Sequence, residues 1–119
     1  MTGSRWTLLR WLVFSIYAVL VGFLSLSPIV PSMPNDSDKL AHWFAYCGFA
    51  VLAIIVVRNK SQHILCCLMI ILYGGLLEIA QGFSLYRSMS VLDFIANCFG
   101  VIVGYFIVRL LADGRWFRR

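Results

Sequence analysis

Four long apolar runs constrain this chain more than any other feature of its sequence. They cover about residues 8–26, 40–57, 64–82 and 91–111, and each connection between them contains at least one basic residue. A transmembrane helix needs about 20 mainly apolar residues to cross a hydrocarbon layer about 30 Å thick. Because the 119 residues hold four such runs and little else, we predict an all-α polytopic membrane protein. It would be an antiparallel four-transmembrane-helix bundle that forms a single domain over residues 1–119.

The composition excludes a soluble domain. Apolar residues make up 61% of the chain and charged residues 13%, against about 45–50% and 25% in soluble proteins. A net charge of +5 would suggest a nucleic-acid partner for a soluble protein, but here the basic residues separate apolar runs instead of forming a patch. We therefore expect no nucleic-acid partner. The first run is long for a signal peptide and lacks a small-residue cleavage site, so we expect it to remain as a helix.

The basic residues predict the orientation of the bundle. Only Lys39 and Arg87 flank one side of the predicted helices. The other eight of the 10 basic residues flank the opposite side: Arg5, Arg10, Arg58, Lys60, Arg109, Arg115, Arg118 and Arg119. Short loops rich in Lys and Arg stay in the cytoplasm. We therefore expect both termini in the cytoplasm and the side of Lys39 and Arg87 at the outer face.

A layer of polar residues lies in or just above the outer half of the predicted helices. Its members are Lys39, His42, Glu78, Gln81, Arg87, Ser90, Asp93 and Asn97. Glu78 and Gln81 are three residues apart, and Asp93 and Asn97 are four apart, so each pair shares a helix face. An ionised carboxylate in lipid costs roughly 2.5–3.5 kcal/mol on insertion scales. The two carboxylates must therefore face protein, water or a cation.

Several members of this layer also have a structural explanation. Asp93 can accept hydrogen bonds from Arg87 or from backbone amides at the start of the last helix. Lys39 can extend to lipid phosphate, and His42 can be a neutral residue bonded to a neighbour.

Glu78 is the hardest member to explain structurally. In the expected register it lies in mid-helix, where it gains nothing from a helix N-terminus. Gln81 and Asn97 are more typical of hydrogen bonds between helices. Below the layer, Gly100 and Gly104 form a small-xxx-small pattern that favours close helix packing.

These residues belong to a longer pattern. It consists of Asp38-Lys39-Leu40-Ala41-His42-Trp43-Phe44-Ala45-Tyr46, then Glu78-Ile79-Ala80-Gln81, then Arg87, Ser90, Asp93, Asn97, Gly100 and Gly104. In order and spacing this pattern resembles the VanZ-like family of small bacterial membrane proteins, over a core of about residues 36–104. The resemblance implies a multi-pass protein of the bacterial cytoplasmic (inner) membrane that is associated with the cell envelope. The founding member of that family is linked to teicoplanin resistance.

Three functions remain open for this layer. The leading hypothesis is a binding module in which Lys39 and Arg87 contact the phosphate or carboxylate of an anionic lipid or polyprenyl-linked envelope precursor. The other members of the layer would hold the side chains of Lys39 and Arg87 in position or bind hydroxyl and amide groups of the headgroup. The second is an enzyme acting on such a headgroup, with Glu78, His42 and Asp93 as catalytic candidates.

The third function is a small proton-coupled transporter that uses the same three catalytic candidates. Four helices make a narrow protomer, so a transport path would require a homo-oligomer. The sequence has no local metal-ligand spacing such as H-E-x-x-H. We therefore expect no metal site and no cofactor.

Overall fold

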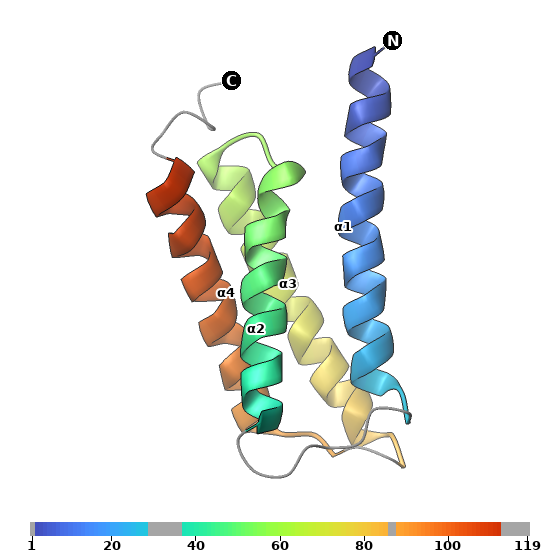
Figure 1. Ribbon diagram of the computed structural model, residues 1–119. Helices are drawn as coiled ribbons and strands as arrows, with labels where there is room; N and C mark the ends of the chain where they lie inside the picture. Colours follow the sequence, from blue (N-terminus) through green and yellow to red (C-terminus); the bar gives the residue numbers. More distant parts are fainter. Residues whose placement is uncertain (1, 29–36, 86–87, 113–119) are drawn as a thin grey trace.

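The computed structural model describes residues 2–28, 37–85 and 88–112. Within them the chain forms α1 (Thr2–Leu26), α2 (Ser37–Leu52), a 3₁₀ turn η1 (Ala53–Ile55), α3 (Lys60–Gly82) and α4 (Val91–Ala112). All four α-helices are long and apolar enough to cross a membrane. Successive helices run in opposite directions, so α1 begins and α4 ends at the same end of the bundle (Figure 1). The all-α four-helix fold is therefore confirmed, and its orientation in a membrane stays a prediction.

The helix boundaries extend beyond the apolar runs. α1 begins at Thr2 instead of residue 8, and α3 begins at Lys60 instead of residue 64. For α3 the reason is a cap, because the side chain of Asn59 accepts a hydrogen bond of 2.9 Å from the backbone N–H of Gln62. α2 begins at Ser37 and its α-helical part stops at Leu52, with η1 in place of the expected continuation to residue 57.

α2 packs more closely against α4 than any other two helices pack. Gly100 and Gly104 lie at this contact. A Cβ atom on Gly104 would lie only 2.5 Å from the carbonyl oxygen of Cys47, and one on Gly100 would meet the carbonyl oxygen of Trp43. Because neither glycine has a side chain, the two backbones come into contact. This contact sets the first turns of α2 beside the first turns of α4.

Apolar residues form both the main core and the outer surface of the bundle. The core contains buried aromatic and small residues, among them Tyr46, Phe49, Ala50, Ile70 and Val101. The outward faces of all four helices carry large apolar side chains that are mostly exposed, for example Leu8, Phe44, Leu72 and Phe106. An apolar surface of this extent is not tolerated in water and is typical of a protein surrounded by lipid.

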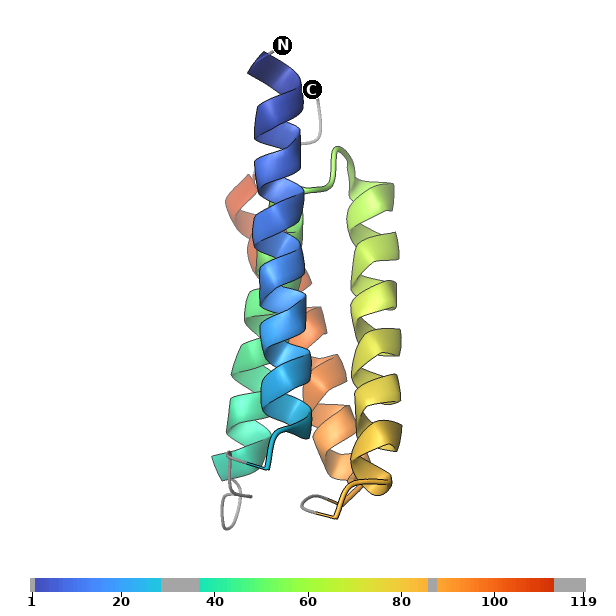
Figure 2. The same cartoon turned by 90° about the vertical axis from the view of Figure 1, so that its right-hand side faces the viewer.

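α1 is joined to the other helices by tyrosine hydroxyl groups. Tyr17 of α1 donates a hydrogen bond of 2.6 Å to the carbonyl oxygen of Ala45 in α2. Tyr73 of α3 donates one of the same length to the carbonyl oxygen of Ala18 in α1. Figure 2 shows α1 in front of the other helices, with α3 to one side of it. Because most of α1 is exposed, these hydrogen bonds are important for holding it in place.

We expect the double variant Tyr17→Phe/Tyr73→Phe to loosen α1 while the other three helices stay folded. Each substitution removes one interhelical hydrogen bond, worth on the order of 0.6 kcal/mol in a membrane protein. Thermal unfolding of the purified protein in detergent, followed by circular dichroism, should show a lower midpoint. Tyr105→Phe is the matched control, because Tyr105 contacts His63 through its ring, with centroids 5.1 Å apart. An equal loss of stability in both variants would contradict the role given to the two hydroxyls.

Candidate functional site

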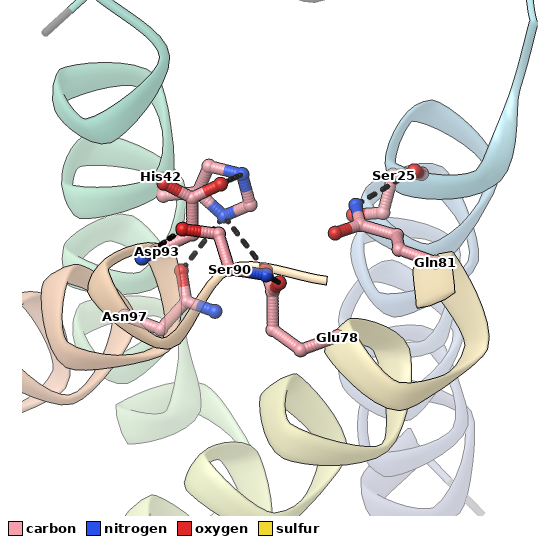
Figure 3. A network of polar contacts seen from close by, with 7 residues as sticks. All are labelled: Ser25, His42, Glu78, Gln81, Ser90, Asp93 and Asn97. Carbon is pink, nitrogen blue, oxygen red and sulfur yellow. Dashed lines mark hydrogen bonds and ion pairs between the residues drawn. The ribbon is translucent and has the colours of Figure 1, made fainter. Parts of the chain in front are cut away.

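A polar network formed by His42, Glu78, Asp93 and Asn97 lies inside one end of the bundle (Figure 3). We call this the polar end; here α1 and α3 end and α2 and α4 begin. His42 is at the centre of the network and is only 9% exposed. Its Nδ1 lies 2.9 Å from Asn97 Oδ1 and 3.8 Å from Glu78 Oε1, and its Nε2 lies 3.7 Å from Asp93 Oδ2. One imidazole therefore joins α2 to both α3 and α4.

The contact with Asn97 determines which nitrogen of the His42 ring carries the proton. An amide oxygen can only accept a hydrogen bond, so Nδ1 is the donor. In the neutral ring, Nε2 then presents a lone pair. That lone pair faces the carboxylate of Asp93 at 3.7 Å, which is beyond the range of a hydrogen bond. In the neutral ring, one nitrogen of His42 therefore donates a hydrogen bond, and the other is an acceptor that faces another acceptor, the Asp93 carboxylate.

Glu78 connects α3 to the start of α4. It is 4% exposed, and its Oε2 accepts a hydrogen bond of 3.2 Å from the backbone N–H of Ser90, the residue before α4. The expectation that Glu78 gains nothing from a helix N-terminus was wrong, because the start of α4 lies beside the last turns of α3. The carboxylate complements the positive end of the α4 dipole, so part of its burial is explained structurally.

Ser90 caps α4 and Asp93 lies in its first turn. The hydroxyl oxygen of Ser90 accepts a hydrogen bond of 3.3 Å from the backbone N–H of Asp93. This is the usual role of serine at a helix start. Asp93 itself is buried and directs its carboxylate at His42 (Figure 3). Capping explains why Ser90 lies here, but it does not explain why the Asp93 carboxylate points at His42.

Asp38 is the candidate that the sequence analysis missed. It lies in the first turn of α2, next to Lys39, and both residues interact electrostatically with Asp93. Asp38 and His42 are four residues apart and share one face of α2. With Asp93 they offer three donor atoms that all lie within 4.8 Å of one another. The D-x-x-x-H spacing was a signal for the first pair, but an aspartate at a helix start is usually a cap.

Gln81 does not join the polar network. Its amide Nε2 donates a hydrogen bond of 2.8 Å to the carbonyl oxygen of Ser25 in α1, on the opposite side of Glu78 from His42 (Figure 3). Gln81 therefore holds α1 against α3 at the polar end. Arg87 lies outside the described residues, so its contact with a headgroup stays a prediction from sequence.

An apolar groove runs between α1 and α3 near the same end. It has a volume of about 600 Å³ and is lined by Val19, Gly22, Phe23, Leu26, Ser27, Pro28, Tyr73 and Leu77. Leu77 directly precedes Glu78, so the groove and the polar network lie on neighbouring faces of α3. The groove is suited to a hydrocarbon chain, and the network to a polar group at the end of one.

A protein-family model described as VanZ/LLP1 matches residues 5–112 of the chain. This match confirms the VanZ-like resemblance. It also extends beyond the core of about residues 36–104 and includes nearly all of α1. No curated protein and no solved structure matched the chain.

Proposed function

This chain belongs to the VanZ/LLP1 family, and we propose that it binds an anionic lipid or envelope-precursor headgroup at its polar end. We place it in the bacterial cytoplasmic membrane, as a multi-pass protein associated with the cell envelope. The observation that carries the proposal is the buried network of His42, Glu78, Asp93 and Asn97, which places two carboxylic acids and an imidazole inside a bundle with a mainly apolar core. Ionisable groups inside a membrane protein are costly to bury, and they usually mark a functional site.

The depth of the network fits a headgroup. His42 is five residues beyond Ser37, the first residue of α2, or about 8 Å along the helix axis. The hydrocarbon layer is about 30 Å thick, so its midplane lies about 15 Å from either boundary. A headgroup can therefore reach the network from the membrane surface without crossing the midplane.

Lys39 supplies the positive charge that lies nearest to the network among the described residues. It follows Asp38 in the first turn of α2, and it interacts with Asp93. An ammonium group binds phosphate as a point charge, whereas the guanidinium of Arg87, as predicted from sequence, would bind it through two parallel hydrogen bonds. The groove between α1 and α3 would hold the hydrocarbon chain of the same molecule.

The distribution of basic residues supports an outer-leaflet position for the polar end. Envelope precursors are presented to the outside of the cell on polyprenyl chains, and such a ligand has both the anionic group and the long apolar chain that this site would bind. The founding member of the family is linked to teicoplanin resistance, and we propose that headgroup binding is how this chain would contribute to glycopeptide tolerance.

Headgroup binding can be measured in nanodiscs of phosphatidylcholine by titration with a short-chain phosphatidylglycerol, with short-chain phosphatidylcholine as the neutral comparison. We expect saturable binding of the anionic lipid, weakened about tenfold or more in Lys39→Ala, since a charge-assisted hydrogen bond contributes about 1.5–3 kcal/mol. Lys60→Ala, which removes an exposed lysine at the opposite end, should bind as the wild type does.

Equal affinity for the two lipids, or an equal effect of the two lysine substitutions, would contradict headgroup binding at the polar end. Turnover of the lipid that is lost in Glu78→Gln would assign the same residues to an enzyme. Proton-coupled uptake into liposomes that is lost in Glu78→Gln would assign them to a transporter.

A further inference from the structure

Among the described residues of the polar end, carboxylic acids outnumber lysine and arginine, which is unusual for a site that binds an anion. Among the described residues there, Asp38, Glu78 and Asp93 are carboxylic acids, and Lys39 is the basic residue beside them. An anionic headgroup would be repelled by these three carboxylates when they are ionised. Buried charges in proteins are paired or coordinate metals. A bound cation would remove this conflict.

The three donor atoms of Asp38, His42 and Asp93 have the spacing of metal ligands. All lie within 4.8 Å of one another, and His42 Nε2 is 3.7 Å from Asp93 Oδ2. Ligands at about 2.0–2.1 Å from a tetrahedral Zn²⁺ ion are about 3.4 Å apart. Small side-chain rotations would therefore bring these atoms to coordination distance.

His42 gives an independent reason to place a cation here. It is nine-tenths buried, its Nδ1 lies 2.9 Å from Asn97 Oδ1, and its Nε2 lies 3.7 Å from Asp93 Oδ2, beyond the range of a hydrogen bond. A cation between Nε2 and the Asp93 carboxylate would bind both atoms. Histidine ligands in metal sites show this same arrangement, since the second nitrogen donates to an oxygen that fixes the ring and its tautomer.

Asp38 and Asp93 also favour a positive charge at this position. One carboxylate oxygen of each lies within 4.8 Å of the other. Two carboxylates this close repel each other unless they share a proton or bind a cation between them. The two aspartates and His42 therefore converge on one point that needs positive charge.

We propose that Asp38, His42 and Asp93 bind a first-row divalent cation, such as Mn²⁺ or Zn²⁺, which in turn binds the anionic oxygen of the headgroup. One imidazole and two carboxylates suit these ions better than Mg²⁺ or Ca²⁺, which prefer oxygen ligands alone. Three protein ligands leave at least one coordination position open for a headgroup oxygen. The bridging role rests on the proposed function, whereas the cation site itself does not.

Mn²⁺ is the best probe of the site, because the chain has free thiols at Cys47, Cys66, Cys67 and Cys98, and thiolates bind Zn²⁺ strongly. Untagged protein in nanodiscs of phosphatidylcholine would be titrated with MnCl₂, and free Mn²⁺ measured by electron paramagnetic resonance. We expect about one Mn²⁺ per chain, bound at least tenfold more weakly in His42→Gln and Asp93→Asn. Asn97→Ala, which frees the ring of His42, should weaken binding by about 10–100-fold.

Glu78→Gln is the matched control. It removes one negative charge from the same end of the bundle, but Glu78 is not among the three donors. A general attraction of cations to a negative surface would be weakened equally by Glu78→Gln and Asp38→Asn, which would overturn the proposal. A specific site requires a much larger effect for Asp38→Asn.

A second measurement needs no substitution and so does not depend on the folding of a variant. Pulsed electron paramagnetic resonance of Mn²⁺ bound to the wild type should show coupling to an imidazole nitrogen, which changes when histidine is labelled with ¹⁵N. The chain has two histidines, and the coupling should disappear in folded His42→Gln and persist in folded His63→Gln. If Mn²⁺ did not bind, or if bound Mn²⁺ showed no nitrogen coupling, the cation site would be overturned. A proton shared between Asp38 and Asp93 would then be favoured.

The lipid titration with and without EDTA separates this proposal from the proposed function. Phosphatidylglycerol binding that is lost in EDTA and restored by Mn²⁺ supports the bridge. Binding that persists in EDTA overturns the bridge and leaves headgroup binding intact. If Mn²⁺ binds but the protein shows no selectivity for the anionic lipid, the cation site stands and the proposal of headgroup binding is overturned.

Discussion

Replacing Gly100 with leucine should prevent α2 from packing against α4 and so abolish the polar site. A Cβ atom at this position would meet the backbone carbonyl oxygen of Trp43 and would lie 3.1 Å from the backbone nitrogen of Cys47. A side chain could rotate away, but a helix backbone can yield only if the two helices separate. Overpacking in a core costs typically about 1–3 kcal/mol, and we expect more here because the obstacle is backbone. Folded yield by size-exclusion chromatography should fall sharply.

Gly3→Leu is the control for the glycine substitution. Gly3 also lies in a helix, but a Cβ atom there would have nothing within 4 Å. Leucine has a higher helix propensity than glycine by somewhat less than 1 kcal/mol, so this variant should be as stable as the wild type or slightly more stable. If Gly100→Leu and Gly3→Leu gave the same yield and melting midpoint, the close contact of α2 with α4 would be contradicted.

The second large effect should follow the replacement of His42 with leucine. The ring is the partner of Asn97 Oδ1, and its nitrogens lie 3.8 Å from Glu78 Oε1 and 3.7 Å from Asp93 Oδ2. Removing it leaves the buried amide oxygen of Asn97 without this partner, and an unsatisfied buried polar group typically costs about 1–3 kcal/mol. The midpoint of unfolding in detergent should therefore drop strongly.

His42→Gln separates stability from binding. Glutamine can still donate a hydrogen bond to Asn97 Oδ1, so the fold should keep most of its stability. Its amide cannot replace an imidazole lone pair, so cation binding, and any headgroup binding that depends on the cation, should be lost. If His42→Leu were as stable as the wild type, the polar network would have no structural importance.

The fold was predictable because its cause is local in the sequence. A run of apolar residues long enough to cross a hydrocarbon layer forms a helix there almost regardless of its neighbours, since backbone groups in lipid must bond internally. The helix starts were less predictable. Asn59 starts α3 at Lys60 by capping, and a count of apolar residues does not register a cap.

The site was predictable only within single helices. The four-residue spacing of Asp93 and Asn97 correctly indicated a shared face, and both side chains meet His42. A residue that enters the site only through the packing of two helices was missed. Asp38 reaches Asp93 only because α2 and α4 approach closely in one register, and nothing in the spacing of either helix specifies that register.

The residues of α3 illustrate the same limit. Glu78 and Gln81 were grouped by their spacing, yet Glu78 contacts the start of α4 and Gln81 contacts Ser25 of α1. Two residues about one turn apart on α3 therefore contact two different helices. A search for local metal-ligand motifs is limited in the same way, because it cannot find a group of donors such as Asp38, His42 and Asp93, which come from two helices.

The central claim is that the polar end binds an anionic headgroup, and native mass spectrometry with lipidomics of the purified protein tests it most directly. Wild type and Lys39→Ala would be extracted from the same bacterial membranes under identical conditions, with Lys60→Ala as the control. The claim predicts that wild type and Lys60→Ala retain a bound lipid or precursor with a phosphate or carboxylate group, and that folded Lys39→Ala retains much less of it. Identical lipids on all three proteins, or only bulk zwitterionic lipid on the wild type, would contradict the claim.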